Sequence, residues 1–367
     1  MIGNSQHGFG SFRPPDLGAG AAMLRAEHGA ASELAESELP EAARQPQANY
    51  AALDLGTNNC RLLIARPARG GFRVVDAFSR IVRLGEGLAN SGQLSEAAMA
   101  RTIEALKVCA GKIGQRRATA GRYVATEACR RADNCGAFLD RVRDEIGIEL
   151  EIISSAEEAR LVVAGCAPLL HSRIPYALVF DIGGGSTEIV WLRRHGSRSG
   201  ARPEILGSVS LPFGVVTFTE RFGGIEVSPA IYRAMVAEAE AALQPFEREH
   251  SIRREVRARQ VQMLGSSGTV TTLAGVHLAL PRYIRAFVDG SMLTFDQIEL
   301  VSRHLAGLDI EGRAANPCVG RERADLVLSG CAILDAICAT WPVGRLRVAD
   351  RGIREGILFE LMQGGPE

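Results

Sequence analysis

The stretch LVFDIGGGSTEIVWL, residues 178–192, decides the fold: an apolar strand ends near an aspartate, a glycine-rich turn follows, and a second apolar strand begins. The stretch ALDLGTNNCRLLI, residues 52–64, shows the same pattern much earlier in the chain. Short apolar runs bounded by glycine are typical of buried strands. A strand–turn–strand unit that recurs at so long an interval indicates a duplicated domain rather than a solenoid. We therefore expect two similar halves whose turns face each other across a cleft.

Strands and helices alternate around both turns, which predicts a layered α/β architecture. We expect domain I at residues 47–157, domain II at residues 158–352, and a last helix at residues 353–367 that packs back on domain I. Residues 1–46 are rich in Ala, Gly, Glu and Pro and poor in aromatic and β-branched side chains. Such a composition buries too little apolar surface to offset the entropy of ordering, so we expect a disordered tail.

Capping residues predict where several helices begin. Ser95 precedes an amphipathic segment, and Ser154 or Ser155 precedes the segment AEEARLVVAGC. We also expect helices at residues 228–249 and 322–340.

The composition excludes several classes of protein. The chain has 42 basic and 42 acidic residues, and this balance argues against a broad surface for nucleic acid or membrane. No apolar run reaches the roughly 18 residues needed to cross a bilayer. The first residues do not have the pattern of a signal peptide, so we expect a cytoplasmic protein. Eight cysteines and seven histidines are dispersed without zinc-ligand spacing, which leaves a hard cation bound through oxygen as the expected metal.

The two turns have the chemistry of a phosphate site. Glycines let successive backbone N–H groups point into one concavity, and the hydroxyls of Ser186 and Thr187 add further donors. Asp181 ends its strand where it can hold Mg²⁺, and strand alternation turns Glu188 toward the same cleft. A single such turn is equally well a β-hairpin that needs glycine for its geometry. The second copy favours the phosphate site.

Two other segments have open interpretations. The loop at residues 265–269 lies between a predicted strand and a predicted helix, where Thr269 either lines the cleft or caps the helix. The basic run formed by Arg253, Arg254, Arg257 and Arg259 is more simply a solvated turn, with a track for a polyanion as the alternative.

Four motifs together resemble the exopolyphosphatase/guanosine pentaphosphate phosphohydrolase (Ppx/GppA) family, from about Tyr50 to Leu361. They are LDLGTNNCRLLIA, FDIGGGSTEIV, LGSSGTVTTLAG and ADRGIREGIL, and SAEEARL lies between the first two. The family belongs to the superfamily of actin, sugar kinases and the heat-shock chaperone ATPases. The resemblance implies duplicated actin-like (ribonuclease H-like) α/β domains with an interdomain active-site cleft. The chain is similar to the short two-domain members, because it shows no His-Asp pair of an additional C-terminal domain.

The resemblance also implies roles for individual residues. Glu158, just before Ala-Arg, matches the proposed base, and Asp181 and Glu188 are associated with catalysis. Asp54, Asp181 and Glu188 would hold Mg²⁺, with Mn²⁺ as an alternative. The implied phosphate-binding residues are Gly56, Thr57, Asn58, Arg61, Gly183, Gly184, Gly185, Ser186, Thr187, Ser267, Gly268 and Thr269.

The function that the resemblance favours is exopolyphosphatase, which hydrolyses terminal phosphoanhydride bonds of inorganic polyphosphate. The alternatives are guanosine pentaphosphate 5′-phosphohydrolase and a nonhydrolytic regulator that binds polyphosphate or a nucleotide, while a sugar kinase fits the motifs less well. A homodimer is the expected assembly, with no nucleic-acid or membrane partner. Glu127 is a second candidate for the base. Because successive helix positions differ by about 100°, we expect Glu158 to face the cleft and Glu157 to face solvent.

Overall fold

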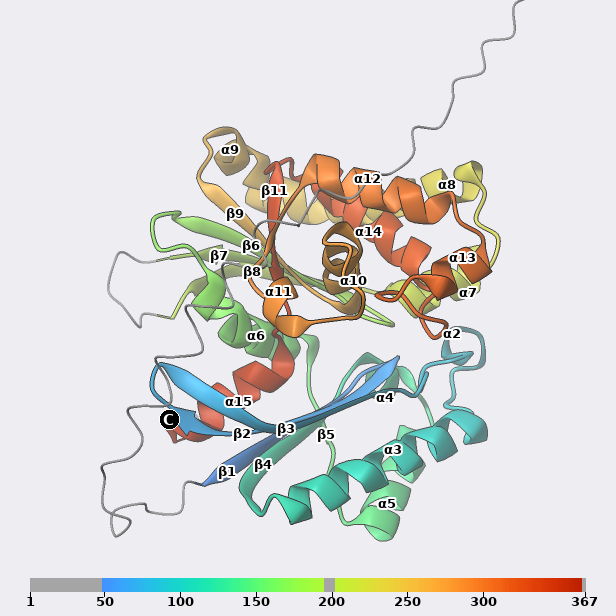
Figure 1. Ribbon diagram of the computed structural model, residues 1–367, viewed down its shortest axis with the longest axis vertical. Coiled ribbons are helices and arrows are strands. Elements are labelled where there is room, and N and C mark those ends of the chain that lie inside the picture. The colour runs from blue at the N-terminus through green and yellow to red at the C-terminus, as the bar shows by residue number, and fades with distance from the viewer. Residues whose placement is uncertain (1–47, 195–201, 365–367) are drawn as a thin grey trace, which may run out of the picture.

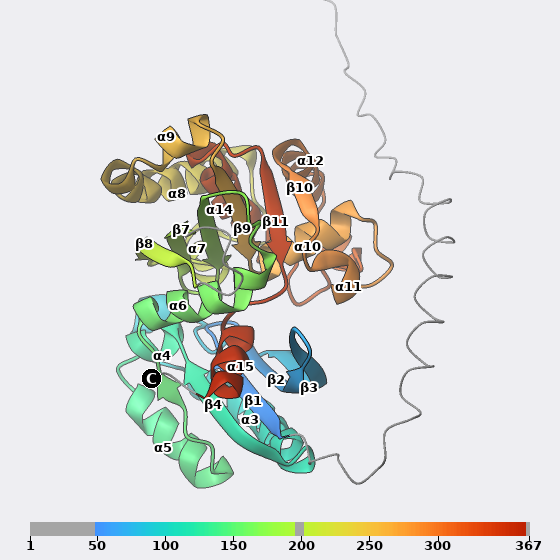
Figure 2. The same ribbon diagram turned by 90° about the vertical axis from the view of Figure 1, so that its left-hand side faces the viewer.

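A computed structural model describes residues 48–194 and 202–364; the tail predicted at residues 1–46 lies outside this range. The described residues form two mixed β-sheets, one in each half of the molecule, with helices on both faces of each sheet (Figures 1 and 2). Among these residues, no helix combines the length and the apolar character needed to cross a membrane.

The first half contains a five-stranded sheet in the order β3-β2-β1-β4-β5. Its strands are β1 (Asn49–Leu55), β2 (Asn59–Ala68), β3 (Gly71–Ile81), β4 (Ala118–Ala125) and β5 (Glu151–Ile152). Its helices are α2 (Leu88–Ser91), α3 (Glu96–Gln115), α4 (Glu127–Arg131) and α5 (Cys135–Ile146). Helices α3 and α5 cover one face, where Ile103, Leu106 and Phe138 pack on the strands as amphipathic helices do.

The second half contains a six-stranded sheet in the order β10-β11-β9-β6-β7-β8. Its strands are β6 (Tyr176–Ile182), β7 (Thr187–Arg193), β8 (Glu204–Leu211), β9 (Val261–Ser266), β10 (Met292–Thr294) and β11 (Arg345–Ala349). Its helices are α7 (Val215–Phe222), α8 (Pro229–His250), α9 (Ile252–Arg257), α10 (Gly268–His277), α11 (Arg285–Val288), α12 (Phe295–Ala306), α13 (Ile310–Ala315) and α14 (Val327–Thr340). The apolar helix α14 is buried along most of its length.

The two sheets share one plan. In both, a central strand pairs antiparallel with the strand that follows it and parallel with a strand that arrives after a helix: β1 with β2 and β4, β6 with β7 and β9. The duplicated α/β fold expected from the two turns is therefore confirmed.

Two helices lie between the sheets, α6 (Ser155–Cys166) and α15 (Ile353–Gln363) (Figure 2). A short 3-10 turn, Ala167–Leu169, follows α6. A third apolar core contains Leu161 and Val162 of α6, Ile357 and Leu358 of α15, and residues from both sheets. Helix α15 packs on β1 and β2 as well as on α6, so the end of the chain returns to the first sheet.

Candidate active site

Each turn follows a central strand, and the register of the strand pairs decides which side chains share its face. Asp54 lies opposite Arg61 in the β1–β2 pair, and Asp181 lies opposite Glu188 in the β6–β7 pair. Residues directly opposite each other in an antiparallel pair project to the same side of the sheet. In the first half, the aspartate therefore lies beside a positively charged arginine. In the second half, the corresponding aspartate lies beside a glutamate.

The first turn (residues 56–59) and the second turn (residues 183–186) are closed by the same hydrogen bond. The Gly56 N–H donates to the Asn59 carbonyl over 2.9 Å, and the Gly183 N–H donates to the Ser186 carbonyl over 2.9 Å. In both turns a later segment of the chain binds a further carbonyl: the Gly85 N–H donates to the Thr57 carbonyl over 2.9 Å, and the Val215 N–H donates to the Gly183 carbonyl over 3.0 Å. The groups left to bind a ligand are therefore mainly N–H groups, which suit an anion.

The two turns touch, and glycine is what permits it. A Cβ atom on Gly184 would lie 3.0 Å from the Cβ of Thr57, and a Cβ on Gly185 would lie 2.7 Å from the Thr57 hydroxyl oxygen. Neither glycine has a positive φ, so the requirement is close approach and not backbone conformation.

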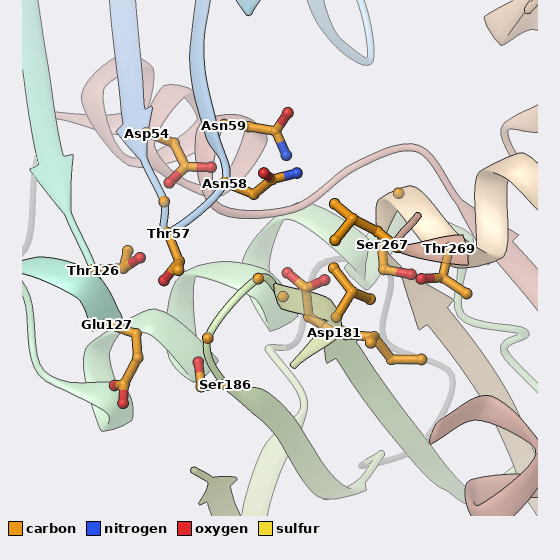
Figure 3. Close-up of a pocket in the computed structure, with 18 of the residues that line it drawn as sticks. Asp54, Thr57, Asn58, Asn59, Thr126, Glu127, Asp181, Ser186, Ser267 and Thr269 are labelled. Carbon is orange, nitrogen blue, oxygen red and sulfur yellow. The ribbon is translucent and has the colours of Figure 1, made fainter. Parts of the chain in front are cut away.

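A cavity of about 110 Å³ lies where the turns meet (Figure 3). Figure 3 shows Asp54 and Thr57 on one side and Asp181 and Ser186 on the other. The cavity brings together most of the residues predicted to bind phosphate or metal, namely Asp54, Gly56, Thr57, Asn58, Arg61, Glu158, Asp181, Gly183, Gly184, Gly185, Ser186, Ser267, Gly268 and Thr269. These residues come from four separate segments of the chain, and a smaller cavity lined by Arg351 and Arg354 adjoins them at Asp54 and Asp181.

Helix α6 places Glu158 in the cavity. Ser154 caps this helix by accepting a hydrogen bond from the Glu157 N–H over 3.2 Å, which selects Ser154 over Ser155 as the cap. The Glu158 side chain is buried. Burial raises the pKa of its carboxyl, the neighbouring charge of Glu188 raises it further, and the Arg130 guanidinium opposes both.

Arg130 connects both candidates for the base. Its Nη1 donates to Glu158 Oε2 over 2.8 Å and to the Ile153 carbonyl over 2.9 Å, while its Nη2 donates to Glu127 Oε2 over 2.9 Å. Glu127 also lines the cavity. Both glutamates are therefore available to the same cavity, and geometry alone leaves Glu127 as a second candidate.

Glu157 has surroundings that the sequence did not predict. It was expected to face solvent, but Arg122 Nη1 donates to it over 2.8 Å and Arg160 Nε over 2.7 Å, so it belongs to an ion-pair network that links α6 to β4. That expectation was wrong because Arg122 reaches this helix end from β4 through tertiary packing, while Arg160 lies in α6 itself at the i,i+3 spacing that allows an ion pair. The hydrogen bond from Arg160 holds the pKa of Glu157 below its usual value.

Two residues predicted for the cleft lie outside the cavity lining. The Thr187 hydroxyl donates to the Phe213 carbonyl over 2.8 Å and is fully buried in the strand layer. Glu188 is buried beneath the second turn and accepts a hydrogen bond from Ser210 over 2.9 Å. The negative charge of Glu188 still affects the cavity, because it raises the pKa of the Glu158 carboxyl.

The loop between β9 and α10 divides its two roles between neighbours. Ser267, and not Thr269, caps α10 by accepting from the Val270 N–H over 3.0 Å. Thr269 lines the cavity and is packed against Gly330, where a Cβ atom would lie 2.3 Å from its hydroxyl oxygen.

The oxygen atoms around the turns suit a hard cation. Burial raises the pKa values of Asp54 and Asp181, and the charge of Arg61 offsets this effect only in part. The side-chain oxygens Oδ1 of Asn58 and Asn59 are buried without a hydrogen-bond partner. No three His, Cys, Asp or Glu side chains of residues 48–194 and 202–364 converge as a preformed metal site. Mg²⁺ commonly takes one or two carboxylates and fills its other positions with water and phosphate oxygens, so these residues fit it.

Arg323 is a cavity residue that the sequence analysis missed. It approaches from the segment before α14, and its Nη1 donates to the Thr272 hydroxyl over 3.3 Å. Burial lowers the pKa of Arg323, and the charge of Arg61 lowers it further. An anion bound in the cavity would therefore stabilise the charged forms of both arginines. Nothing in GRERADL marks this arginine, because only tertiary folding brings it to the turns.

Comparison with known proteins finds relatives along most of the chain. Residues 63–364 match the model of the Ppx/GppA phosphatase family. A guanosine-5′-triphosphate,3′-diphosphate pyrophosphatase of Aeromonas salmonicida is 32% identical over 314 residues, which are 85% of this chain and 59% of the relative. The chain therefore spans less than two thirds of the length of this curated relative.

Two solved structures are similar. A Ppx/GppA family member of Aquifex aeolicus has a TM-score of 0.70 and 28% identity, with 88% of this chain and all of that chain covered. An exopolyphosphatase of Cytophaga hutchinsonii has a TM-score of 0.76 at 23% identity, covering 87% of this chain and 99% of its own; this likeness shows the fold.

Proposed function

The chain belongs to the Ppx/GppA phosphatase family, and from that membership and the geometry of its cleft we propose that it hydrolyses the terminal phosphoanhydride bond of inorganic polyphosphate. The composition of the cavity lining carries the proposal. Hydroxyl groups, carboxylates, two asparagines, glycines and two arginines line it together with five aliphatic residues, and none of the described lining residues is aromatic. Proteins commonly hold a nucleobase by stacking it on an aromatic side chain, so the lining favours an inorganic substrate.

In the proposed reaction, the N–H groups of both turns bind the oxygens of the terminal phosphate. Arg61 and Arg323 add positive charge from the first sheet and from the segment before α14. Phosphoryl transfer has a loose transition state, so positioning and charge stabilisation supply most of the catalysis. Glu158 orients the attacking water and accepts its proton, and Arg130 holds the carboxylate in place.

Asp54 and Asp181 are the proposed ligands of a divalent cation, with Glu188 acting on the site through its charge. The bound cation would neutralise charge on the phosphate oxygens. We expect EDTA-treated protein to lose turnover and to regain it with Mg²⁺ or Mn²⁺, and protein that keeps full activity in metal-free buffer would contradict this assignment.

Hydrolysis of guanosine pentaphosphate is the second candidate. The curated relative from Aeromonas salmonicida is named for such an activity, and it supports this substrate for the family. A homodimer and a cytoplasmic location are further proposals.

The deciding experiment measures phosphate release in parallel from long polyphosphate, tripolyphosphate, guanosine pentaphosphate and ATP. We expect kcat/KM to be highest for the inorganic substrates. The Asp181→Asn variant, purified in the same way, controls for contaminating phosphatases and should be inactive. A preference for guanosine pentaphosphate would establish the second candidate, and binding of polyphosphate without release from any substrate would indicate a regulator.

A further inference from the structure

An ion pair joins the two halves of the molecule at the edge of the cleft. Arg83, which follows β3, donates from Nη1 to Asp325 Oδ2 over 2.9 Å and from Nη2 to Asp325 Oδ1 over 3.0 Å. Arg83 Nη2 also lies 3.2 Å from the Glu322 carbonyl, and the Gly87 N–H donates to Glu220 over 2.8 Å nearby. Figure 1 shows this edge, where α2 lies beside α7 and away from the end of α15.

The backbone of Arg83 is fastened to the first turn. The N–H groups of Val82 and Arg83 both donate to the Asn58 carbonyl, over 2.9 and 3.1 Å, and Gly85 binds the Thr57 carbonyl. Arg83 has a φ of +48°, a left-handed conformation that is costly for a residue other than glycine. Such a conformation persists only where surrounding contacts hold it, so the position of this guanidinium depends on the first turn.

The other partner is fastened beside the cavity. Asp325 lies two residues after Arg323 and directly before Leu326, and both of these neighbours line the cavity. Its own carbonyl is packed against Gly224, where a Cβ atom would lie only 2.2 Å away. The segment that carries Arg323 is not helical here, so its position depends on such contacts with other segments.

Most exposed ion pairs contribute little to stability, but this one has the paired geometry that makes an arginine–carboxylate contact specific. Both side chains are largely shielded, with exposed fractions of 32% and 23%. Arg323 is held near Arg61, whose like charge opposes its presence. Without a fixed segment, this repulsion would move Arg323 away from the turns when no anion is bound.

We propose that the Arg83–Asp325 pair is a clasp that positions Arg323 against the first turn, so that the empty cleft is already arranged for a phosphate group. This inference rests on the proposed function of the cleft as a phosphate site. Arg83 and Asp325 are positioning residues: they act on the substrate through Arg323 and through Asn58.

The clasp makes a specific kinetic prediction. Arg83→Gln and Asp325→Asn should each raise KM for tripolyphosphate at least tenfold and leave kcat within about threefold, because Glu158 and the acids remain in place. The exchanged pair Arg83→Asp with Asp325→Arg should return KM to within about threefold of the wild type, since aspartate tolerates the left-handed backbone. Arg193→Gln is the matched control: it breaks a paired contact with Glu204 inside the second sheet and should change neither constant.

Binding is also measured without turnover, by calorimetry of tripolyphosphate with Mg²⁺ in the Glu158→Gln background. Weaker binding in each single variant, recovered in the exchanged pair, supports the clasp. Single variants that bind as tightly as their parent overturn it, as does an exchanged pair no better than the single variants. If either single variant fails to fold, Arg83→Lys replaces it. This variant keeps the charge and loses the paired geometry, so we expect an intermediate loss of binding affinity. A wild type that binds tripolyphosphate but releases no phosphate from any substrate would refute the proposed function and leave the clasp standing.

Discussion

Glu157 and Glu158 are adjacent residues of the same type that the structure places in different surroundings. Glu158 is buried in the cavity and paired with Arg130, whereas Glu157 is paired with Arg122 and Arg160 on a different face of the helix start. Glu158→Gln keeps the shape and removes the negative charge, so we expect kcat to fall by about 10²–10⁴ with little change in KM. Steady-state phosphate release on the favoured substrate measures both constants.

Glu157→Gln is the matched control for this change. It should leave turnover within a few-fold and lower the free energy of unfolding by about 1 kcal/mol, the usual size of a partly exposed ion pair. Glu127→Gln tests the other candidate for the base. An inactive Glu127→Gln protein beside a fully active Glu158→Gln protein would transfer the role of base to Glu127.

Asp335 predicts a dependence of stability on pH that is separate from the cleft. Burial raises its pKa to about 6, even though the Tyr232 hydroxyl donates to its Oδ2 over 2.6 Å. The folded protein therefore binds this proton more tightly than the unfolded chain does, and the free energy of unfolding falls as the pH rises from about 4 to above 6. Asp335→Asn removes this penalty, so it should raise the free energy of unfolding at pH 8 by about 1–3 kcal/mol and change it little at pH 4. Urea unfolding at the two pH values measures the difference. An equal gain at both pH values would show that the carboxyl keeps its ordinary pKa.

At the scale of single residues, the sequence predicted what is determined locally. The turn residues around Asp54 and Asp181 were predicted because glycine, aspartate and hydroxyl side chains occur there at short spacing. Arg323 was missed, since its role depends on a segment that reaches the cleft only in the folded chain. Thr187 has the right chemistry and a neighbouring position, yet strand alternation turns its hydroxyl toward Phe213.

Helices α6 and α15 cross at two glycines, and this contact sets the distance between the elements that join the sheets. A Cβ on Gly165 would lie 2.2 Å from the Gly352 carbonyl oxygen, and a Cβ on Gly356 would lie 2.2 Å from the Leu161 carbonyl oxygen. Gly356→Ala should therefore force the helices apart and lower the free energy of unfolding by about 1–3 kcal/mol, as overpacking does. Chemical unfolding followed by circular dichroism measures the loss.

Gly111→Ala is the control for this substitution. Gly111 lies inside α3 and has open space where a Cβ would be, so alanine should stabilise the protein by up to about 1 kcal/mol. If Gly356→Ala proved as harmless as Gly111→Ala, the close crossing would be more adaptable than its backbone contacts indicate.

Element boundaries were predictable where a cap decides them and not where tertiary contacts do. Ser95 and Ser154 cap their helices as expected, because a serine hydroxyl needs only the N–H three residues later. The helix expected to begin at residue 322 instead begins at Val327. The intervening segment includes Asp325, whose contacts with Arg83 and Thr219 hold it outside the helix.

At the scale of the whole molecule, duplication made the fold predictable from two short motifs. The recurrence of one strand–turn–strand unit indicated two equivalent sheets, and their strand orders correspond except for β10, which the second sheet has in addition. The contacts between the halves were not predictable in this way. Arg83, Glu220 and Asp325 are ordinary charged residues in the sequence, and their pairing depends on how the two sheets are placed relative to each other.

The basic run in and after α9 tests whether the surface outside the cleft guides a long substrate. Strand β9 begins after this run and ends at Ser266, which borders the smaller cavity, so its six residues place the arginines about 20 Å from the turns. Arg253 is occupied, since its Nε donates to the Thr340 carbonyl over 2.7 Å, but Arg254, Arg257 and Arg259 are exposed. We expect replacement of these three by Gln to leave KM unchanged for tripolyphosphate and for long polyphosphate, because the run lies at the opposite end of the strand from the reacting phosphate. The KM for each substrate is measured at low salt, where surface attraction is strongest. The Arg323→Gln variant is measured in parallel, and its KM should rise for both substrates. A KM that rises for the long chain alone would show that the run is a track for the polyanion.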